Sequence, residues 1–341
     1  MDKAVPNLPN NKPDGFPLVD SYGRFHNNLR ISVTDRCNLR CVYCMPEEVE
    51  FLDRDELLTF EEITEFARVA VGMGIDKIRL TGGEPLLRKN LFSLVNQLAQ
   101  IHELKDLSLT TNGLLLREQA RELKAAGLSR ITVSLDTLRK DRFREICRRD
   151  GLELVLQGLD KALEAGFQVK LNSISMKDFT EDEVVELASF ARGKGLEIRF
   201  IEYMPIGANP WEREKVFLAH EILAKLEEAF GSLNPSSTYD PKAPAMEFEY
   251  ADGKGKVGII ASVSRPFCKQ CNRIRLTAEG KLRNCLFSLD ETDIKPYLRP
   301  SINQEAIKGL IQSNIWGKWE GHEINSSRFV KPLRTMHAIG G

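Results

Sequence analysis

Three cysteines within eight residues constrain this chain more than any other feature of its sequence. They lie in Cys37-Asn38-Leu39-Arg40-Cys41-Val42-Tyr43-Cys44. Thiols spaced this closely converge when the chain wraps around a common ligand, and thiolates suit zinc or iron–sulfur clusters. A structural zinc ion takes four ligands, and no further Cys or His follows nearby. A cubane [4Fe–4S] cluster held by three thiolates leaves one iron open, although zinc or three unrelated cysteines remain the alternative.

A second cysteine triplet, Cys268, Cys271 and Cys285, lies near the end of the chain. With Cys147 the chain has 7 cysteines, an odd number that cannot all pair as disulfides. In a chain without a secretion signal, such triplets favour metal binding. Taken alone, this second triplet is equally consistent with zinc and with an iron–sulfur cluster. Because the first triplet already indicates a cluster, we favour a second cluster here. Cys147 is expected to be a small core or surface residue.

Composition narrows the class of protein. The 341 residues are 42% hydrophobic and 28% charged, as in ordinary soluble proteins. The net charge of −1 argues against a nucleic-acid partner. No apolar run approaches the roughly 18 residues of a membrane span, and residues 1–28 lack the apolar core of a signal peptide. We therefore expect a cytoplasmic protein without a membrane partner, and residues 1–28 as a partly disordered lead-in.

Strands and helices alternate between residues 29 and 203. Thr59 and Glu62 form a capping-box pattern that opens the first helix. Strands are expected at 29–34, 77–81, 107–111, 130–134, 168–173 and 197–202, and helices near 60–73, 91–100, 117–126, 152–165 and 180–194. Six β/α units predict an α/β fold with an incomplete (β/α)6 TIM-like barrel, and an open doubly wound sheet is the alternative.

Polar residues alternate with apolar ones along these strands. Because helices cover the apolar face, the polar side chains should point into the lumen. The lumen cations would be Arg30, Arg79, Lys170 and Arg199. A polyanionic ligand would satisfy them, and Arg suits phosphate geometrically. The alternative is that they pair with nearby carboxylates such as Glu84, Asp136 and Glu202.

The β/α rhythm is expected to stop at about Tyr203. Beyond it we predict a helix at 219–230, a hairpin at 248–260 and a strand at 273–276. Residues 253–258 match G-x-G-x-x-G, but they open no helix, so we do not interpret them as a dinucleotide site. The domains would be a partial barrel at 29–203 and an auxiliary-cluster region at 204–341 that ends in a diglycine tail.

Several motifs resemble those of a known family. The first triplet has the C-x3-C-x2-C spacing of radical S-adenosylmethionine (SAM) enzymes, with an aromatic residue before the last Cys. Over nearly the whole chain, the sequence is similar to the GTP 3′,8-cyclases of molybdenum cofactor biosynthesis, a family of radical SAM enzymes. The motifs that carry this resemblance are 29–46, 78–85, Thr110-Thr111-Asn112-Gly113, Cys268-x2-Cys271-Asn272-Arg273-x-Arg275 with Cys285, and Gly340-Gly341. One departure is a short segment at 46–55.

The resemblance implies roles for these residues. The first [4Fe–4S] cluster would bind SAM, helped by Tyr43, Gly82, Gly83, Glu84, Ser134 and Met204. The second would bind the guanine of GTP. GTP contacts would include Arg30, Arg79, Thr110, Lys170, Arg273, Ile274 and Arg275, and the catalytic Gly340-Gly341 tail would enter the barrel mouth.

The resemblance also implies the reaction and the partners. A deoxyadenosyl radical from SAM would take hydrogen from the 3′ carbon of the ribose. The carbon radical would attack C8 of guanine and give (8S)-3′,8-cyclo-7,8-dihydro-GTP. Partners would be a reductant of the flavodoxin type, the next enzyme of the pathway and a second copy in a homodimer.

Two other readings remain. A radical SAM peptide-modifying enzyme also carries auxiliary clusters, but usually has more C-terminal cysteines. A non-catalytic iron–sulfur or zinc module would leave the lumen arginines without a purpose.

Overall fold

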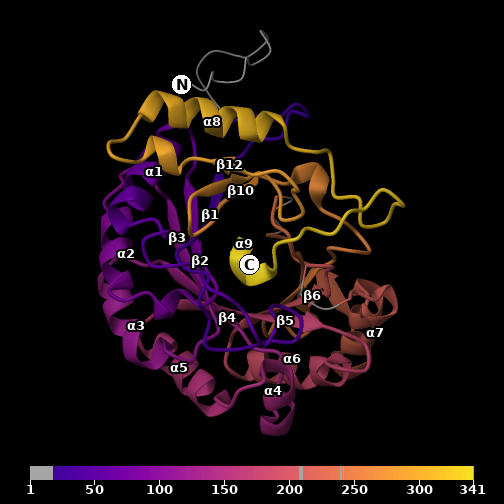
Figure 1. Cartoon of the computed structure of the whole chain (residues 1–341). Helices are drawn as coiled ribbons and strands as arrows, with labels where there is room; N and C mark the ends of the chain where they lie inside the picture. The colour runs from indigo at the N-terminus through magenta and orange to yellow at the C-terminus, as the bar shows by residue number, and fades with distance from the viewer. Residues whose placement is uncertain (1–17, 207–209, 239, 241, 341) are drawn as a thin grey trace.

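A computed structural model describes residues 18–206, 210–238, 240 and 242–340. Its described strands form one twelve-stranded sheet in the order β12-β11-β10-β1-β2-β3-β4-β5-β6-β9-β8-β7. The sheet curves into a partial barrel, and helices line much of its outside (Figure 1).

The first six strands build the barrel wall. They are β1 (Asn28–Ser32), β2 (Lys77–Thr81), β3 (Asp106–Thr111), β4 (Arg130–Ser134), β5 (Gln168–Ser175) and β6 (Glu197–Glu202). Each pairs in parallel with the next along the chain. The predicted incomplete barrel is therefore confirmed.

Six helices follow these strands on the outer side. They are α1 (Phe60–Gly72), α2 (Leu91–Ala99), α3 (Leu116–Ala125), α4 (Lys140–Cys147), α5 (Leu152–Glu164) and α6 (Val184–Gly193). The capping box of Thr59 and Glu62 is present at α1. Helix α4 was not predicted. Thr180 does not cap α6, because its hydroxyl donates to the Ile174 carbonyl and a short helix, η2 (Glu181–Glu183), precedes α6.

Later strands lengthen the sheet at both edges. Strands β9 (Lys256–Ile260), β8 (Met246–Tyr250) and β7 (Leu233–Pro235) follow β6, and β10 (Arg273–Leu276), β11 (Lys281–Arg283) and β12 (Thr292–Asp293) follow β1 on the other side. The predicted hairpin is the antiparallel pair β8–β9. However, β9 pairs in parallel with β6 and β10 with β1, so parallel pairing continues beyond the predicted barrel. The domain boundary itself stays a prediction.

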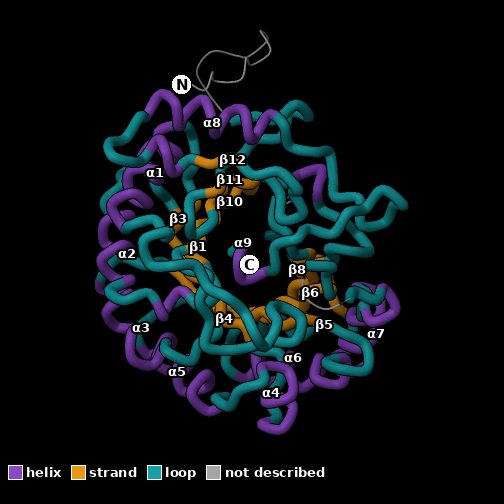
Figure 2. The backbone as a smooth tube through the Cα atoms, in the orientation of Figure 1, coloured by secondary structure: helices purple, strands orange, loops and turns teal. Residues whose placement is uncertain are grey.

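The remaining helices lie around this extension. They are α7 (Ala219–Phe230), α8 (Gln304–Trp316) and α9 (Met336–Ile339), with the short helices η1 (Pro85–Leu87), η3 (Arg213–Lys215), η4 (Cys268–Gln270) and η5 (Lys295–Tyr297). Helix α8 lies beside the β10–β12 edge, whereas α9 lies in the middle of the ring (Figures 1 and 2). Helix α9, the last described helix, is thus surrounded by the strands of the barrel.

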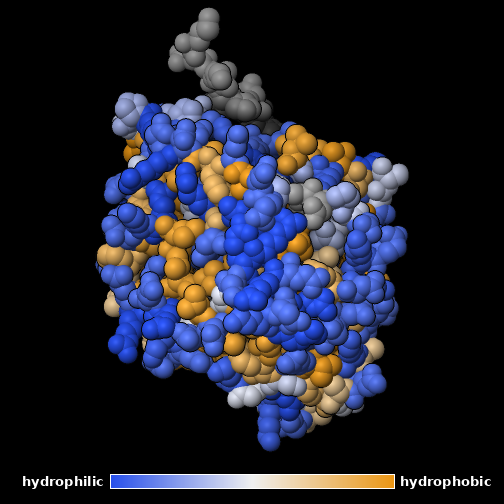
Figure 3. Space-filling model, turned by 60° about the horizontal axis from the view of Figure 1, so that its bottom comes forward, coloured by the Kyte–Doolittle hydropathy of each residue, from blue (hydrophilic) through white to orange (hydrophobic). Residues whose placement is uncertain are grey.

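The two faces of the barrel wall differ as the alternation predicts. Leu29, Ile31 and Leu80 are fully buried in the core under the helices. Arg30 and Arg79 alternate with them and face the lumen. The outer face shown in Figure 3 is largely hydrophilic, with separate hydrophobic areas. No helix in the described residues is long and apolar enough to cross a membrane.

Candidate active site

The first cysteine loop follows β1 and packs closely against the loop after β2. Gly83 N–H donates to the Thr34 carbonyl at 2.7 Å, and Glu84 N–H donates to the Arg36 carbonyl at 2.7 Å. A Cβ at Gly82 would lie 2.6 Å from the Thr34 carbonyl oxygen, and one at Gly83 would collide with the Arg36 carbonyl. These glycines therefore let two loops approach each other. Their contact with SAM remains a prediction.

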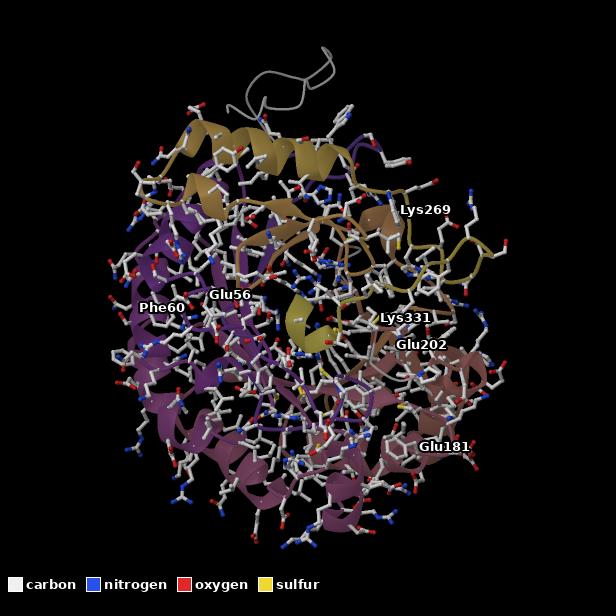
Figure 4. All side chains as sticks on the ribbon, in the orientation of Figure 1. Glu56, Phe60, Glu181, Glu202, Lys269 and Lys331 are labelled. Atoms are coloured by element: carbon white, nitrogen blue, oxygen red, sulfur yellow. The ribbon has the colours of Figure 1, made fainter. Side chains whose placement is uncertain are left out.

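Three buried carboxylates hold the loops around the barrel mouth. Glu84 accepts from the Thr111 hydroxyl and the Asn112 N–H, both at 2.7 Å, and burial raises its pKa to about 7. Asp136 accepts from the Tyr43 hydroxyl at 2.6 Å, and burial raises its pKa to about 6. Glu202, labelled in Figure 4, accepts from three main-chain N–H groups, those of Ala219, Val263 and Ser264. None of these three carboxylates forms an ion pair with Arg30, Arg79, Lys170 or Arg199 in the described chain.

Neutral donors surround the sulfurs of the first triplet. Leu39 N–H donates to Cys37 Sγ at 3.4 Å, and the Asn112 side-chain amide lies 3.8 Å from the same sulfur. The main-chain N–H of His337 donates to Cys44. Burial raises the pKa of Cys37 to about 12 and that of Cys44 well above its usual range. Amide donors to sulfur are a feature of iron–sulfur sites.

The end of α4 supports this loop from below. The Arg40 and Val42 N–H groups donate to the carbonyls of Cys147 and Ile146, at 2.9 and 3.0 Å. Cys147 is buried, and its Sγ lies 3.9 Å from Cys41 Sγ. Cys147 was predicted to be a small core or surface residue, and the structure places it in the core.

Cations surround the second cysteine loop. Lys318 Nζ donates to Cys271 Sγ at 3.3 Å, and Arg273 Nη2 donates to the same sulfur at 3.5 Å. Burial alone would raise the pKa of the Cys271 thiol, but the charges of Arg273 and Lys318 lower it to about 5. The main-chain N–H of His322 donates to Cys268. This site therefore favours a thiolate.

Arg24 fixes the second loop to the start of the described chain. Its guanidinium donates to the carbonyls of Cys268, Trp319 and Glu320 at 2.6–2.8 Å and pairs with Asp20 at 2.5 Å. Arg24 and Asp20 are both buried. The described part of the predicted lead-in, residues 18–28, is therefore built into the fold, and residues 1–17 lie outside the described residues.

Strand register brings the lumen arginines together. Arg30 lies between Arg275 of β10 and Arg79 of β2 in the pairing of the three strands. Arg79 donates to the hydroxyls of Thr110 and Thr132 at 3.0 and 2.9 Å. Burial, followed by the neighbouring cations, lowers the pKa of Arg79 and Arg275 to about 10 and that of Arg30 well below its usual range.

These arginines form no ion pair with a carboxylate in the described chain. Arg30 makes no hydrogen bond or ion pair there, and the thiol of Cys271 opposes the lowering of its pKa. Arg273 stacks on Phe267, with 4.5 Å from its guanidinium carbon to the ring centroid. We interpret this group of Arg30, Arg79, Arg273 and Arg275, hereafter the arginine cluster, as an anion site.

The other two lumen cations are neutralised within the protein. Lys170 pairs with Glu197, and Arg199 pairs with Glu197 and Glu247 at 2.5 and 2.8 Å. The alternative that lumen cations pair with carboxylates therefore holds for Lys170 and Arg199, although their partners are Glu197 and Glu247. A contact between Lys170 and GTP remains a prediction.

Ile274 differs from its neighbours on β10. Its side chain is fully buried in the hydrophobic core. Only its main chain could therefore contact a substrate.

The tail reaches both cysteine regions. Gly340 accepts from Arg275 Nη1 at 2.6 Å, and a Cβ there would lie 2.7 Å from Thr81 Oγ1 and 2.9 Å from Ser32 Cβ. Its φ of +82° also favours glycine. Gly341 lies outside the described residues.

The two remaining predicted SAM contacts lie at the same end of the barrel. Met204 packs against the small hydrophobic cluster that contains Ile339 of α9, and Ser134 ends β4. The contact of these two residues with SAM remains a prediction.

The donor sets fit two clusters. In the described part of the chain, no three His, Cys, Asp or Glu side chains are close enough to surround a single metal ion. A cubane binds each thiolate through a different iron, so its ligands need not converge on one point. Three thiols with sulfur-directed donors at each loop match that arrangement.

Sequence reasoning missed several residues of this site. Lys318, Arg24 and His337 belong to no motif, and each reaches its cysteine loop from a distant part of the chain. Asn112 stood in a quoted motif, but only the structure places it at Cys37.

Comparisons with known proteins agree with this description. The radical SAM superfamily model matches residues 31–191, and the molybdenum cofactor synthesis C model matches residues 196–324. The crystal structure of SuiB from Streptococcus suis has a TM-score of 0.62 at 14% identity, over 89% of this chain and 69% of that one. Its complex with S-adenosylmethionine gives 0.59 at 14%, over 91% and 77%. These likenesses show the fold, and with the family models they define a radical SAM enzyme.

Relatives of higher sequence identity show which family of radical SAM enzymes the chain belongs to. The GTP 3′,8-cyclase of Rhodopirellula baltica is 48% identical over 98% of this chain and 94% of the relative. Those of Streptomyces coelicolor and Thermodesulfovibrio yellowstonii are 46% and 44% identical over 95% of this chain, covering 96% and 100% of the relatives. The chain belongs to the GTP 3′,8-cyclase family. Its cofactors are accordingly two [4Fe–4S] clusters and SAM, and neither a peptide-modifying enzyme nor a non-catalytic module accounts for these matches.

Proposed function

We propose that this chain converts GTP into (8S)-3′,8-cyclo-7,8-dihydro-GTP, the first step of molybdenum cofactor biosynthesis. The observation that carries the proposal is the arginine cluster, which lies in the lumen and forms no ion pair with a carboxylate of the described residues. A triphosphate supplies the missing negative charge, and guanidinium groups bind phosphate oxygens in pairs. Family membership supports GTP as the nucleotide.

The two cysteine loops would divide the work. Cys37, Cys41 and Cys44 would hold the first cluster, which together with SAM supplies a 5′-deoxyadenosyl radical when reduced. Cys268, Cys271 and Cys285 would hold the second, near the guanine. Arg273 and Arg275 lie on the strand that separates Cys271 from Cys285, so this strand would bring the triphosphate and the guanine site together.

Several protein groups would position the cofactor. Tyr43 is oriented by Asp136, and Glu84 holds the Gly82–Gly83 loop against the cysteine loop. Ser134 and Met204 complete the predicted SAM contacts. Fixing ribose against deoxyadenosine in this way is what the protein contributes to the rate.

The tail would complete the site from the open side. Helix α9 lies in the middle of the ring of strands (Figure 2), and Gly340 packs on β1 and β2 beside Arg275. A tail in this place excludes water from the radical. The reductant of the flavodoxin type, the next pathway enzyme, a homodimer and a cytoplasmic location follow from the family resemblance.

Anaerobic turnover tests the proposal. Reconstituted protein is incubated with SAM, dithionite and either GTP or ATP, and deoxyadenosine and cyclised nucleotide are quantified together. We expect cyclised product from GTP and little from ATP. SAM cleavage without any GTP-derived product would contradict the proposal.

A further inference from the structure

Lys318 is a buried cation to which the function proposed above assigns no role. It follows Gly317 at the end of α8, and only 4% of its surface is exposed. Its Nζ donates to the Arg273 carbonyl at 2.7 Å and to Cys271 Sγ at 3.3 Å. No carboxylate in the described chain forms an ion pair with it. A buried ammonium group is costly unless a negative group balances it, and Cys271 is the group in reach.

The segment around Lys318 is fixed around the second cysteine loop. Arg24 holds the carbonyls of Trp319 and Glu320 together with that of Cys268. A Cβ at Gly321 would lie 3.4 Å from Cys268 Cβ. Lys318 is therefore held in place by its own chain segment, and its contact with Cys271 is built into the fold.

We propose that Lys318 is a positioning residue of the second cluster, where its charge offsets the Cys271 thiolate and raises the one-electron reduction potential. The proposal rests on the assignment of Cys268, Cys271 and Cys285 to that cluster. Hydrogen bonds to cluster sulfurs and nearby charge tune the potential. A fixed positive charge favours the reduced form, which carries one more negative charge.

Lys318 and Arg273 have different surroundings although both donate to Cys271. The Arg273 side chain belongs to the arginine cluster, where a bound triphosphate would neutralise part of its charge. Lys318 is held by the main-chain carbonyl of Arg273 and is almost fully buried. Lys318 would therefore keep the potential raised when substrate is bound.

The test isolates the second cluster. In a background with Cys37, Cys41 and Cys44 changed to Ala, the remaining cluster is reconstituted and titrated with a low-potential reductant that supplies one electron. The reduced state is followed by its paramagnetic resonance signal. Lys318→Met should lower the equilibrium constant for reduction of the cluster about tenfold, which corresponds to a reduction potential about 59 mV lower for one electron. Lys318→Arg should restore it.

A matched control is Lys295→Met. Lys295 Nζ also donates to a main-chain carbonyl, that of Glu56 at 2.6 Å, but it contacts no thiol. We expect this variant to keep the parental potential and iron content.

Three outcomes would overturn the proposal. An unchanged potential in Lys318→Met with full iron would remove the electrostatic role. If Lys318→Met holds no cluster, Lys318→Arg decides, because failure of both would assign Lys318 to packing. A parent background without iron would overturn the cluster assignment itself, a result separate from any effect of Lys318.

Discussion

The two cysteine loops carry the same ligand set in opposite electrostatic surroundings. At the first loop, neutral amides approach the sulfurs, and burial raises the pKa of Cys37 to about 12. At the second, Lys318 and Arg273 approach Cys271 and lower its pKa to about 5. Burial acts in the same direction at both, so the difference comes from the cations.

This difference fits the partner that each loop would receive. SAM carries its own positive sulfonium and would meet a loop whose sulfurs accept no hydrogen bond from a cation in the described chain. GTP is a polyanion and would meet the loop beside the arginine cluster. The contrast suggests that the chain sorts two ligands to two chemically similar clusters by charge.

The largest expected effect comes from removing the first cluster while the second is kept. Cys37→Ala should abolish deoxyadenosine formation, because the site that cleaves SAM loses one of three ligands. The second cluster should remain, so iron should fall from about eight to about four per chain if each site holds a cubane. Iron and sulfide analysis after anaerobic reconstitution checks this. Stoichiometric zinc without sulfide would refute both clusters.

The next effect tests the tail that lies between the loops. Gly340→Ala should lower cyclised product at least tenfold, because small misplacements of reacting groups are costly. The added Cβ would meet Ser32 and Thr81. Iron content and melting temperature should stay nearly unchanged, and deoxyadenosine should still form.

Gly253→Ala is the matched control for the tail variant. Gly253 also has a positive φ, +70°, but a Cβ there meets nothing within 4 Å. Parental turnover by Gly340→Ala would show that the tail has no positioning role.

A third prediction concerns the arginine cluster. Arg79→Ala should weaken GTP binding by about 1.5–3 kcal/mol, the range for a hydrogen bond to a charged group. Arg199→Ala is the control, because Arg199 already pairs with Glu197 and Glu247, and it should weaken GTP binding less. Anaerobic equilibrium binding measures both, and equal affinities of parent and Arg79→Ala would refute the placement of the triphosphate.

The smallest expected effect compares how the loops are held. Arg24 donates to carbonyls around the second loop, and Arg40 donates to the Cys37 and Leu39 carbonyls of the first at 2.8 and 2.9 Å. Arg24 is buried, whereas Arg40 is half-buried. Arg24→Gln should therefore cost about 1.5–3 kcal/mol of unfolding free energy, and Arg40→Gln less. Thermal unfolding under anaerobic conditions ranks the two, and a reversed order would contradict this account.

Local pattern was sufficient to predict the barrel and its polar lumen. Period-two alternation placed Arg30 and Arg79 on the face opposite Leu29 and Ile78, and the register confirms it. The spacing of Cys37, Cys41 and Cys44 identified the first loop. These signals are contained within a few consecutive residues, so a single sequence displays them.

What could not be predicted depends on contacts between distant segments. The parallel pairing of β10 with β1 joins residues more than two hundred positions apart. Lys318 reaches Cys271 only because α8 ends beside the second loop. One partner of Arg199 was missed for the same reason, since Glu247 belongs to a strand outside the predicted barrel.

The most direct test of the division between the loops removes the second triplet. Cys268, Cys271 and Cys285 are changed to Ala, and anaerobic turnover with SAM, GTP and dithionite is followed for deoxyadenosine and cyclised nucleotide together. The account predicts that deoxyadenosine still forms while cyclised nucleotide disappears. Cyclised nucleotide at the parental yield, or loss of deoxyadenosine while the first cluster remains assembled, would contradict it.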